Sequence, residues 1–122
     1  MTNKVFYNHE GYVEIMIVGD QTNLSFMDLK ADADIILERL QKDGKRRLVL
    51  IDISQQGKFS TGSNRAGMEV LESTNYDGVA VFGSNKILEE VTKAIILAMG
   101  KNNAKLFPDR RMAVTWLLGA KA

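Results

Sequence analysis

Short apolar runs alternate with longer amphipathic stretches along the chain, and this alternation predicts most of its elements. Residues 4–7 and 12–18 have the composition of strands, and the turn residues Asn8 to Gly11 between them complete a hairpin. In the second strand Val13 and Ile15 fall on one face and Glu14 on the other. We expect both faces to be partly covered.

Residues 48–53 form a nearly unbroken apolar run, which is typical of a strand covered on both faces. We therefore place this strand at the centre of the sheet. The polar, glycine-containing segment Ser54 to Gly62 is predicted to be the loop that follows it. Two further strands are expected over residues 78–82 and 105–107, the second ended by Pro108.

Four helices are predicted between and after these strands. The first begins at a capping box formed by Ser25 and Asp28, runs to about Lys42 and stops at Gly44. A short second helix starts near Ser63. The third follows the caps Ser84 and Asn85 and closes at Gly100, and Asp109 caps the last, which ends at Gly119.

The order of these elements predicts a mixed sheet. Strands separated by single helices are parallel neighbours with right-handed crossovers, and the leading hairpin adds an antiparallel edge. The fold class is therefore α/β: an N-terminal antiparallel hairpin, then βα units that pack about four helices on the sheet. Because 122 residues suit one core, we expect one domain over residues 1–122.

Composition narrows the classes of function. Sixteen Lys and Arg balance fifteen Asp and Glu, so nucleic acid is not an expected partner. The chain has no Cys and one His, His9 in the hairpin turn, so we expect no catalytic residues, no metal and no cofactor. We expect a bacterial protein. The sequence shows neither a signal peptide nor a transmembrane segment, which predicts a cytoplasmic location.

Two stretches of the sequence resemble a known family. The central strand, residues 49–54, is followed by Ser60-Thr61-Gly62-Ser63-Asn64-Arg65 at a predicted helix start, and the chain ends with Phe107-Pro108-Asp109 before Ala113 and Trp116-Leu117. Both stretches are similar to the SpoIIAA-like group of the STAS superfamily, whose fold is related to that of the CRAL-TRIO lipid carriers. This resemblance implies a STAS fold and a regulatory role without enzymatic activity.

The segment after the central strand is the first candidate site, because open α/β sheets commonly bind ligands at the carboxyl ends of their strands. Its hydroxyl, amide and guanidinium groups could bind a phosphate or carboxylate, or offer a hydroxyl for modification; they belong to Ser60, Thr61, Ser63, Asn64 and Arg65. The alternative is that Thr61 or Ser63 only caps a helix and Arg65 is a solvated charge.

Asp52 is the second candidate, because a carboxylate inside an apolar strand requires hydrogen-bond donors or a cation. It either accepts hydrogen bonds from the following segment and fixes its shape, or contacts a ligand directly. Ser84 and Asn85 follow the next strand on the same side of the sheet, so they either line the same cleft or cap the third helix.

Three hypotheses follow. The leading one is a non-enzymatic regulatory or interaction module that recognises a protein, including a second copy of itself in a homodimer, through the loop from Ser54 to Arg65. The alternative is a small-molecule or lipid binder with a pocket between sheet and helices, where a small anion or a lipid would be the ligand. The third is an enzyme built on Asp52, for which no spacing of residues gives support.

Overall fold

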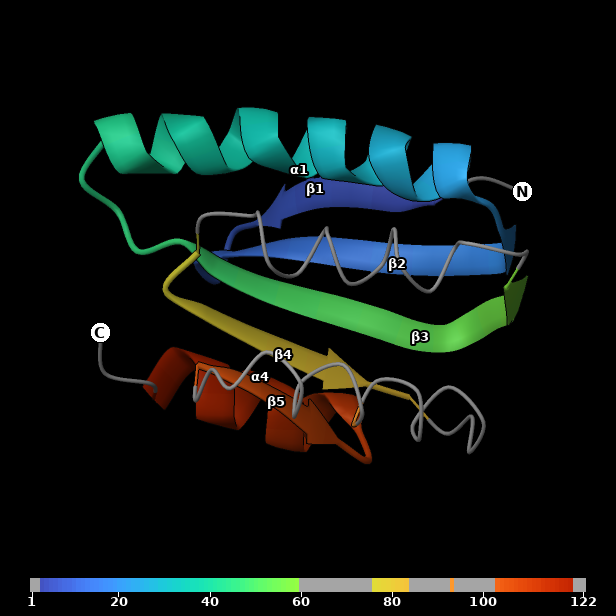
Figure 1. Cartoon of the computed structure of the whole chain (residues 1–122). Coiled ribbons are helices and arrows are strands. Elements are labelled where there is room, and N and C mark those ends of the chain that lie inside the picture. Colours follow the sequence, from blue (N-terminus) through green and yellow to red (C-terminus); the bar gives the residue numbers. More distant parts are fainter. Residues whose placement is uncertain (1–2, 60–75, 84–92, 94–102, 120–122) are drawn as a thin grey trace.

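The computed structural model describes residues 3–59, 76–83, 93 and 103–119. Five strands form one sheet in the order β1-β2-β3-β4-β5. Only β1 is antiparallel to its neighbour, and the other pairs are parallel (Figure 1). The strands are β1 (Lys4–Asn8), β2 (Tyr12–Gln21), β3 (Leu48–Phe59), β4 (Gly78–Phe82) and β5 (Ala104–Phe107), and the described helices are α1 (Asn23–Lys42) and α4 (Arg110–Gly119).

The sheet lies between two apolar layers. On one face α1 packs against alternate residues of the strands, and on the other face α4 does the same (Figure 1). The α1 layer includes Val13, Ile15, Ile17, Leu29, Ala33, Leu37, Leu40, Val49, Ile51 and Val81. The α4 layer includes Tyr12, Leu48, Leu50, Ala80, Phe82, Phe107, Ala113 and Leu117. The predicted mixed sheet with its antiparallel hairpin is thus confirmed, and β3 occupies its centre.

The predicted loop from Ser54 is wrong at its beginning, because β3 continues to Phe59. The neighbouring strand β2 also runs longer than expected, to Gln21. It pairs with this second half of β3 through two irregular steps in register, so the extra residues find backbone partners. The sequence hides this continuation, because residues 54–57 are polar or glycine and show no apolar alternation.

Both described helices have defined ends. α1 is capped by Thr22 rather than by Ser25: the Thr22 hydroxyl accepts from the Ser25 N–H at 3.1 Å, and the Ser25 hydroxyl accepts from the Thr22 N–H at 2.8 Å. The predicted stop at Gly44 is confirmed, since this residue has φ of +69° just after the Asp43 C-cap. Asp109 caps α4 as predicted, accepting from the Met112 N–H at 2.9 Å.

Of the four predicted helices, the structure confirms the first and the last. The helices predicted near Ser63 and after Ser84 and Asn85 lie outside the described residues. Within the part of the chain that the structure describes, no helix has the length and apolar character needed to cross a membrane.

A charged cluster ties α4 to the hairpin. Glu14, 5% exposed on the α4 face of β2, accepts a two-pronged hydrogen bond from the Arg110 guanidinium, with Nη2–Oε1 at 2.7 Å and Nη1–Oε2 at 2.9 Å. Arg110 also donates to the Tyr12 hydroxyl at 3.1 Å, and the Asn8 amide donates to Glu14 at 3.2 Å. The carboxylate is therefore fully partnered, although it is buried.

Replacing Arg110 with Ala should lower the free energy of unfolding by about 1–3 kcal/mol, because the buried Glu14 carboxylate would lose its charged donor. Urea denaturation measures this loss. Arg111→Ala, one residue further along the exposed surface, is the matched control and should change stability by less than about 0.5 kcal/mol. Equal losses in the two variants would contradict the role given to the Glu14–Arg110 pair.

Stability should also fall in acid. Hydrogen bonds from Arg110 hold the pKa of Glu14 below its ordinary value of 4.5, and the backbone N–H of Arg47 does the same for the pKa of Asp77. The unfolded chain therefore takes up protons first as the pH falls, so this stabilisation is complete above about pH 5 and is lost progressively below it. Urea denaturation across this range should show a shallower acid loss for Glu14→Gln than for the wild type, and parallel curves would contradict the assignment.

Candidate recognition site

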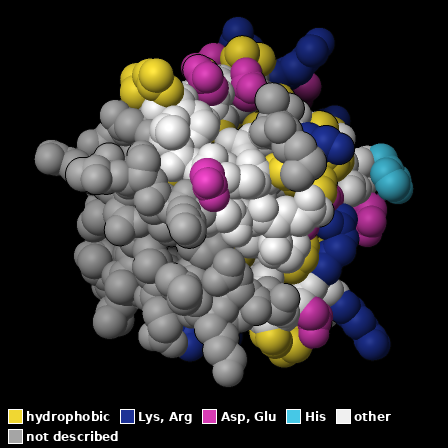
Figure 2. Space-filling view, turned by 90° about the vertical axis from the view of Figure 1, so that its right-hand side faces the viewer, with side chains coloured by type: hydrophobic (Ala, Val, Ile, Leu, Met, Phe, Trp, Pro, Cys, Tyr) yellow, Lys and Arg dark blue, Asp and Glu magenta, His cyan; other side chains and the backbone are white. Residues whose placement is uncertain are grey.

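The carboxyl ends of the parallel strands β2, β3 and β4 point to one end of the molecule, on the right in Figure 1. Figure 2 looks directly onto this end. Its described surface is mostly uncharged polar groups and backbone, with acidic side chains near the centre and top and basic ones towards the right-hand side. Of the predicted site residues, Asp52 lies within β3, and the others follow β3 and β4 in the sequence.

Asp52 uses its carboxylate to hold the backbone of its own strand. It is 9% exposed, and its Oδ1 accepts from the Ser54 N–H at 2.9 Å and from the Ser54 hydroxyl at 2.6 Å. In the ladder Met16 faces Asp52 and Val18 faces Gln55, so β3 carries one residue more than β2 over this step. The carboxylate thus supplies an acceptor to the N–H of a residue inside this bulge. These contacts support the structural interpretation of Asp52.

Gly83 closes β4 directly against the bulge. Its φ is +157°, and a Cβ at this position would lie 2.7 Å from Ile53 Cγ1 and 2.9 Å from the Ser54 backbone nitrogen. No other residue fits between these atoms without displacing β3 or β4. The end of β4 and the bulge of β3 therefore form one packed unit.

The second half of β3 is also closely packed. Gln56 is 6% exposed, and its Nε2 has no hydrogen-bond partner among the described residues. A Cβ added to Gly57 would overlap the Asp20 carboxylate of β2, so glycine is needed there for close approach of the two strands. Polar residues that were predicted to form a loop are therefore part of the sheet.

Of the predicted site residues, only Asp52 lies in the described part of the chain. Ser60, Thr61, Ser63, Asn64 and Arg65, and likewise Ser84 and Asn85, lie outside it. Asp52 pairs with Phe82, close to the end of β4, whereas β3 continues for seven more residues to Phe59. At about 3.3 Å per residue, Phe59 is about 23 Å along the strand from Asp52. The two candidate segments therefore do not start side by side.

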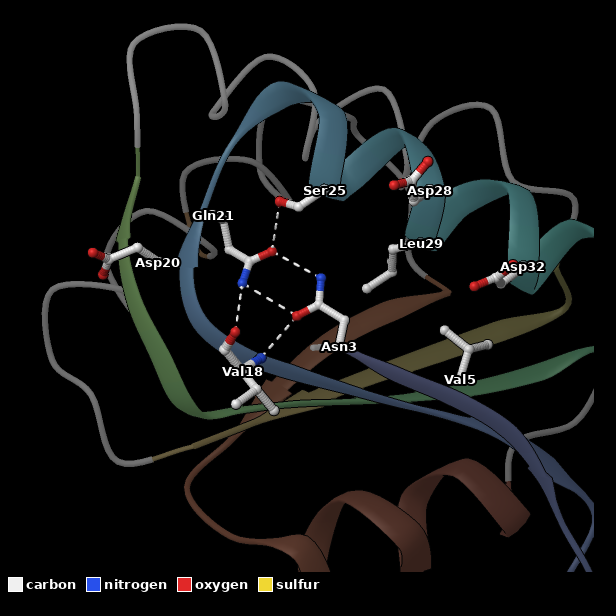
Figure 3. Close-up of a pocket in the computed structure, with 9 residues that line it drawn as sticks. All are labelled: Asn3, Val5, Val18, Asp20, Gln21, Ser25, Asp28, Leu29 and Asp32. Carbon is white, nitrogen blue, oxygen red and sulfur yellow. Dashed lines mark hydrogen bonds between the residues drawn. The ribbon is translucent and has the colours of Figure 1, made fainter. Parts of the chain in front are cut away.

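The structure also places a pocket of about 310 Å³ at the same end, between α1 and the hairpin (Figure 3). Its inner wall is a buried amide pair. Asn3 and Gln21 bond to each other at 2.9 and 3.2 Å, and Gln21, 1% exposed, also donates to the carbonyls of Val18 and Gly19. The Ser25 hydroxyl donates to Gln21 at 2.9 Å, which connects the cap of α1 to this pair.

Carboxylates line the rest of this pocket beside a small apolar wall of Val5, Val18 and Leu29. They belong to Asp20, Asp28 and Asp32, and no Lys, Arg or His is among the lining residues. This charge disfavours an anionic ligand. Among the described residues, no group of acidic or histidine side chains is arranged to hold a metal ion. Sequence reasoning missed the pocket because it assigned Asp28 to a capping box, although the i, i+4 spacing of Asp28 and Asp32 marks one side of a helix.

A second hollow, of about 480 Å³, lies on the other helix layer. Phe107, Met112 and Trp116 line it together with Asp109, Arg111 and Thr115, and it is open to solvent. The Phe107 and Trp116 rings lie 5.5 Å apart between centroids. This surface is apolar but shallow.

Comparison with known proteins gives a match in structure and none in sequence. No protein-family model matches the chain, and no curated protein is detectably similar to it. The fold is similar to that of an uncharacterized protein of the DUF3478 family from Shewanella loihica PV-4, described as having a SpoIIAA-like fold. The TM-score is 0.63 at 17% identity, and the match covers 95% of this chain and 92% of that one.

The fold is likewise similar to that of the anti-sigma factor antagonist SpoIIAA in its unphosphorylated form. Here the TM-score is 0.64 at 9% identity, over 98% of this chain and 100% of SpoIIAA. At such low identities the likeness shows a shared fold. The chain therefore has a SpoIIAA-like, STAS-type α/β fold, as its sequence predicted.

Gly83→Ala should destabilise the protein by about 2–4 kcal/mol, because the new methyl group would collide with Ile53 and with the Ser54 backbone. Gly119→Ala at the end of α4 is the control, since a Cβ there meets nothing within 4 Å, and it should change stability by less than about 0.5 kcal/mol. Thermal unfolding followed by circular dichroism compares the two. If Gly83→Ala unfolds at the wild-type temperature, the close packing of β4 on the bulge is wrong.

Proposed function

We propose that residues 1–122 form one domain that acts as a non-enzymatic regulatory module in the cytoplasm and binds a protein partner. The observation that carries this proposal is the fold, which extends over all of SpoIIAA, a protein named as an anti-sigma factor antagonist. An antagonist of another protein works by binding, and binding requires a formed surface rather than a catalytic constellation. A partner of the anti-sigma factor class is the specific expectation.

The recognition surface is proposed at the carboxyl end of β3. The bulge held by Asp52 and Ser54 and the close packing at Gly57 fix the course of this strand up to Phe59. Residues 60–65 follow directly and offer three hydroxyl groups, the Asn64 amide and the Arg65 guanidinium. Such groups recognise carboxylates and backbone carbonyls of a protein surface. Asp52 has an indirect role, because its carboxylate bonds to Ser54.

Ser84 and Asn85 belong to the proposal as a neighbouring part of the same surface. They follow β4 immediately after Gly83, which packs on Ile53 and Ser54. A partner that contacts both segments would span the step between the end of β4 and the end of β3. This favours an extended protein surface over a compact small molecule as the ligand.

The alternative of a lipid or small-anion binder has less support. The pocket beside α1 is lined with three carboxylates and a buried amide pair, which suits neither a fatty chain nor an anion. The hollow at α4 is apolar but open to solvent. A lipid carrier instead needs an enclosed apolar cavity that covers most of its ligand.

The test is partner capture with a matched control. Three tagged proteins are incubated with lysate of the native host. They are the wild-type chain, a loop variant with Ser60, Thr61, Ser63 and Arg65 replaced by Ala, and a control variant with Lys45 and Arg46 replaced by Ala. Lys45 and Arg46 are exposed at the opposite end of the strands, between α1 and β3. Quantitative mass spectrometry should find one protein that the wild type and the control variant both capture. The amount of this protein captured by the loop variant should be lower by at least about tenfold.

If the loop variant captures as much of the partner as the wild type, and circular dichroism shows that it is folded, residues 60–65 are excluded as the recognition surface. Depletion by the Lys45 and Arg46 variant alone would move the surface to the amino ends of the strands. Either result would contradict the proposal.

A further inference from the structure

β1 is an edge of the sheet, and its backbone has no strand on its outer side. The Asn8 carbonyl accepts from the Gly11 N–H at 3.0 Å, so the backbone groups of Asn8 point towards β2. Because these directions alternate along a strand, the N–H and C=O groups of Val5 and Tyr7 point away from β2. Neither residue has a backbone partner on that side within the part of the chain that the structure describes. These groups are available to the backbone of an added strand.

The two edges of the sheet differ in how they are protected. β5, at the other edge, is four residues long, carries the exposed Lys105 in its middle and is followed by Pro108, and such features discourage an added strand. β1 pairs with β2 in a regular register, and its Lys, Lys4, is at its first position. It exposes Phe6 on one face and Tyr7 on the other, each to 40%. Aromatic side chains on both faces favour contacts with a neighbouring strand.

The pocket of about 310 Å³ lies between this edge strand and α1. Val5 of β1 and Asn3 just before it line the pocket together with Asp28 and Asp32 of α1. Figure 3 shows the Asp32 carboxylate above Val5, whereas the Asp20 carboxylate points away from the other lining residues. Side chains that face each other across two paired strands lie on the same side of the sheet. Residues of an added strand opposite Asn3 and Val5 would therefore point towards the two carboxylates of α1.

Asp28 and Asp32 form a negative pair without a counterion in the described part of the chain. Both side chains are exposed, and like charges four residues apart on a helix repel each other. The basic residues of α1 do not relieve this repulsion. Lys30 pairs with Asp34 at 2.6 Å, and Arg39 is about two turns beyond Asp32 and does not line the pocket. A cation supplied from outside the chain would lower the repulsion.

We propose that an extended, basic segment of another protein adds to the sheet beside β1, with its Lys or Arg side chains at alternate positions in this pocket. The aliphatic part of one such side chain packs against Val5 and Leu29, and its charged end bonds to Asp32. A second basic side chain, two positions away, lies beside Asn3 and reaches Asp28. Backbone pairing supplies the affinity and the alternating cations supply the specificity.

A second copy of this chain fits the edge less well. In an antiparallel pair of β1 strands centred on Phe6, Val5 of one copy faces Tyr7 of the other, so no basic side chain reaches the pocket. Both copies would also bring Asp28 and Asp32 to the same face of the joined sheet, where like charges oppose association. The inference goes beyond the proposed function, because it uses β1 and α1 rather than residues 60–65.

NMR titration of the ¹⁵N-labelled full chain with three synthetic peptides tests the inference. The first is a strand-forming peptide of about eight residues in which Lys alternates with Thr and Val. The second has Glu in place of Lys, and the third is the Lys peptide with its backbone nitrogens methylated, which keeps the charges and removes the donors. The Lys peptide should bind with a Kd of about 0.1–1 mM and shift the amide signals of Val5 and Tyr7. The other two should bind at least about tenfold more weakly.

Two double variants test the carboxylates. Asp28→Asn with Asp32→Asn keeps the size of both side chains and should weaken binding of the Lys peptide at least about tenfold. Glu38→Gln with Asp43→Asn, at exposed positions outside the pocket, removes the same charge and should leave the Kd within about twofold of the wild type. Circular dichroism verifies that both variants are folded.

Equal binding of the Lys peptide by the wild type and the Asp28 and Asp32 variant would overturn the inference, because the carboxylates would then hold no cation. Equal binding of the methylated peptide would overturn the strand pairing, and equal binding of the Glu peptide would overturn the charge preference. Absence of binding at several millimolar or so would overturn both. The partner-capture experiment reads residues 60–65, so each of these failures leaves the proposed function standing.

Discussion

Because β3 is buried between two helical layers, the Asp52 carboxylate requires hydrogen-bond donors. The N–H and the hydroxyl of Ser54, in the same strand, are these donors. They also solve a second problem. An extra residue in one strand of a ladder loses a regular partner for its N–H, and here the carboxylate supplies one. Gly83 packs against Ile53 and Ser54 in this bulge, so only glycine fits at the position that follows β4. The geometry of the strand ends depends on this one bulge.

The bulge has a consequence for the proposed recognition surface, because β3 continues past it beside β2 to Phe59 rather than ending at Ile53. The chain leaves the sheet about 20 Å further along than an unbulged strand ending at the apolar run would. Residues 60–65 therefore follow a strand that ends further along the sheet than the strand that residues 84–85 follow. A large protein surface is better suited to bridge such a step than a small ligand.

The two helical layers have different roles in this arrangement. α4 is fixed to the hairpin by the Glu14–Arg110 pair and is capped by Asp109, so it stabilises the face of the sheet on which Asp52 lies. α1 covers the other face and keeps an apolar stripe on its outer side. The recognition surface proposed at the carboxyl end of β3 and the outer side of α1 are therefore separate surfaces of the chain.

Much of the fold could be predicted from the sequence, because strong patterns determine it. The apolar run of residues 48–53, the stripe of α1 and the Asp109 cap each have one physical interpretation, and the structure confirms them. The continuation of β3 through Gln55 and Gln56 could not be predicted, because β2, rather than the local sequence, supplies their pairing. The Thr22 cap was missed because Ser25 and Asp28 match the usual capping-box pattern, whereas Thr22 is followed three residues later by Ser25, whose hydroxyl takes the place of the usual acidic group.

The pocket and the exposed apolar residues of α1, which include Leu24, Met27 and Ile35, could have been found from the sequence only if each helix residue had been assigned to a face of the helix. Asp28 was used as a cap partner, which hid its place beside Asp32. Leu24 and Met27 precede the buried stripe and resemble its first turn until the burial of Phe26 fixes the rotation of the helix. The role proposed for the residues from Ser60 to Arg65 depends on the identity of a partner, and no sequence pattern specifies that partner.

Site-specific photo-crosslinking in the native host tests most directly whether the carboxyl end of β3 is the recognition surface. A photoreactive amino acid is placed at Thr61 in one strain and at Lys45, at the opposite end of the strands, in another. The account predicts one discrete heterologous adduct from position 61 and none from position 45. An adduct from position 45 alone, or no protein adduct from position 61, would contradict it.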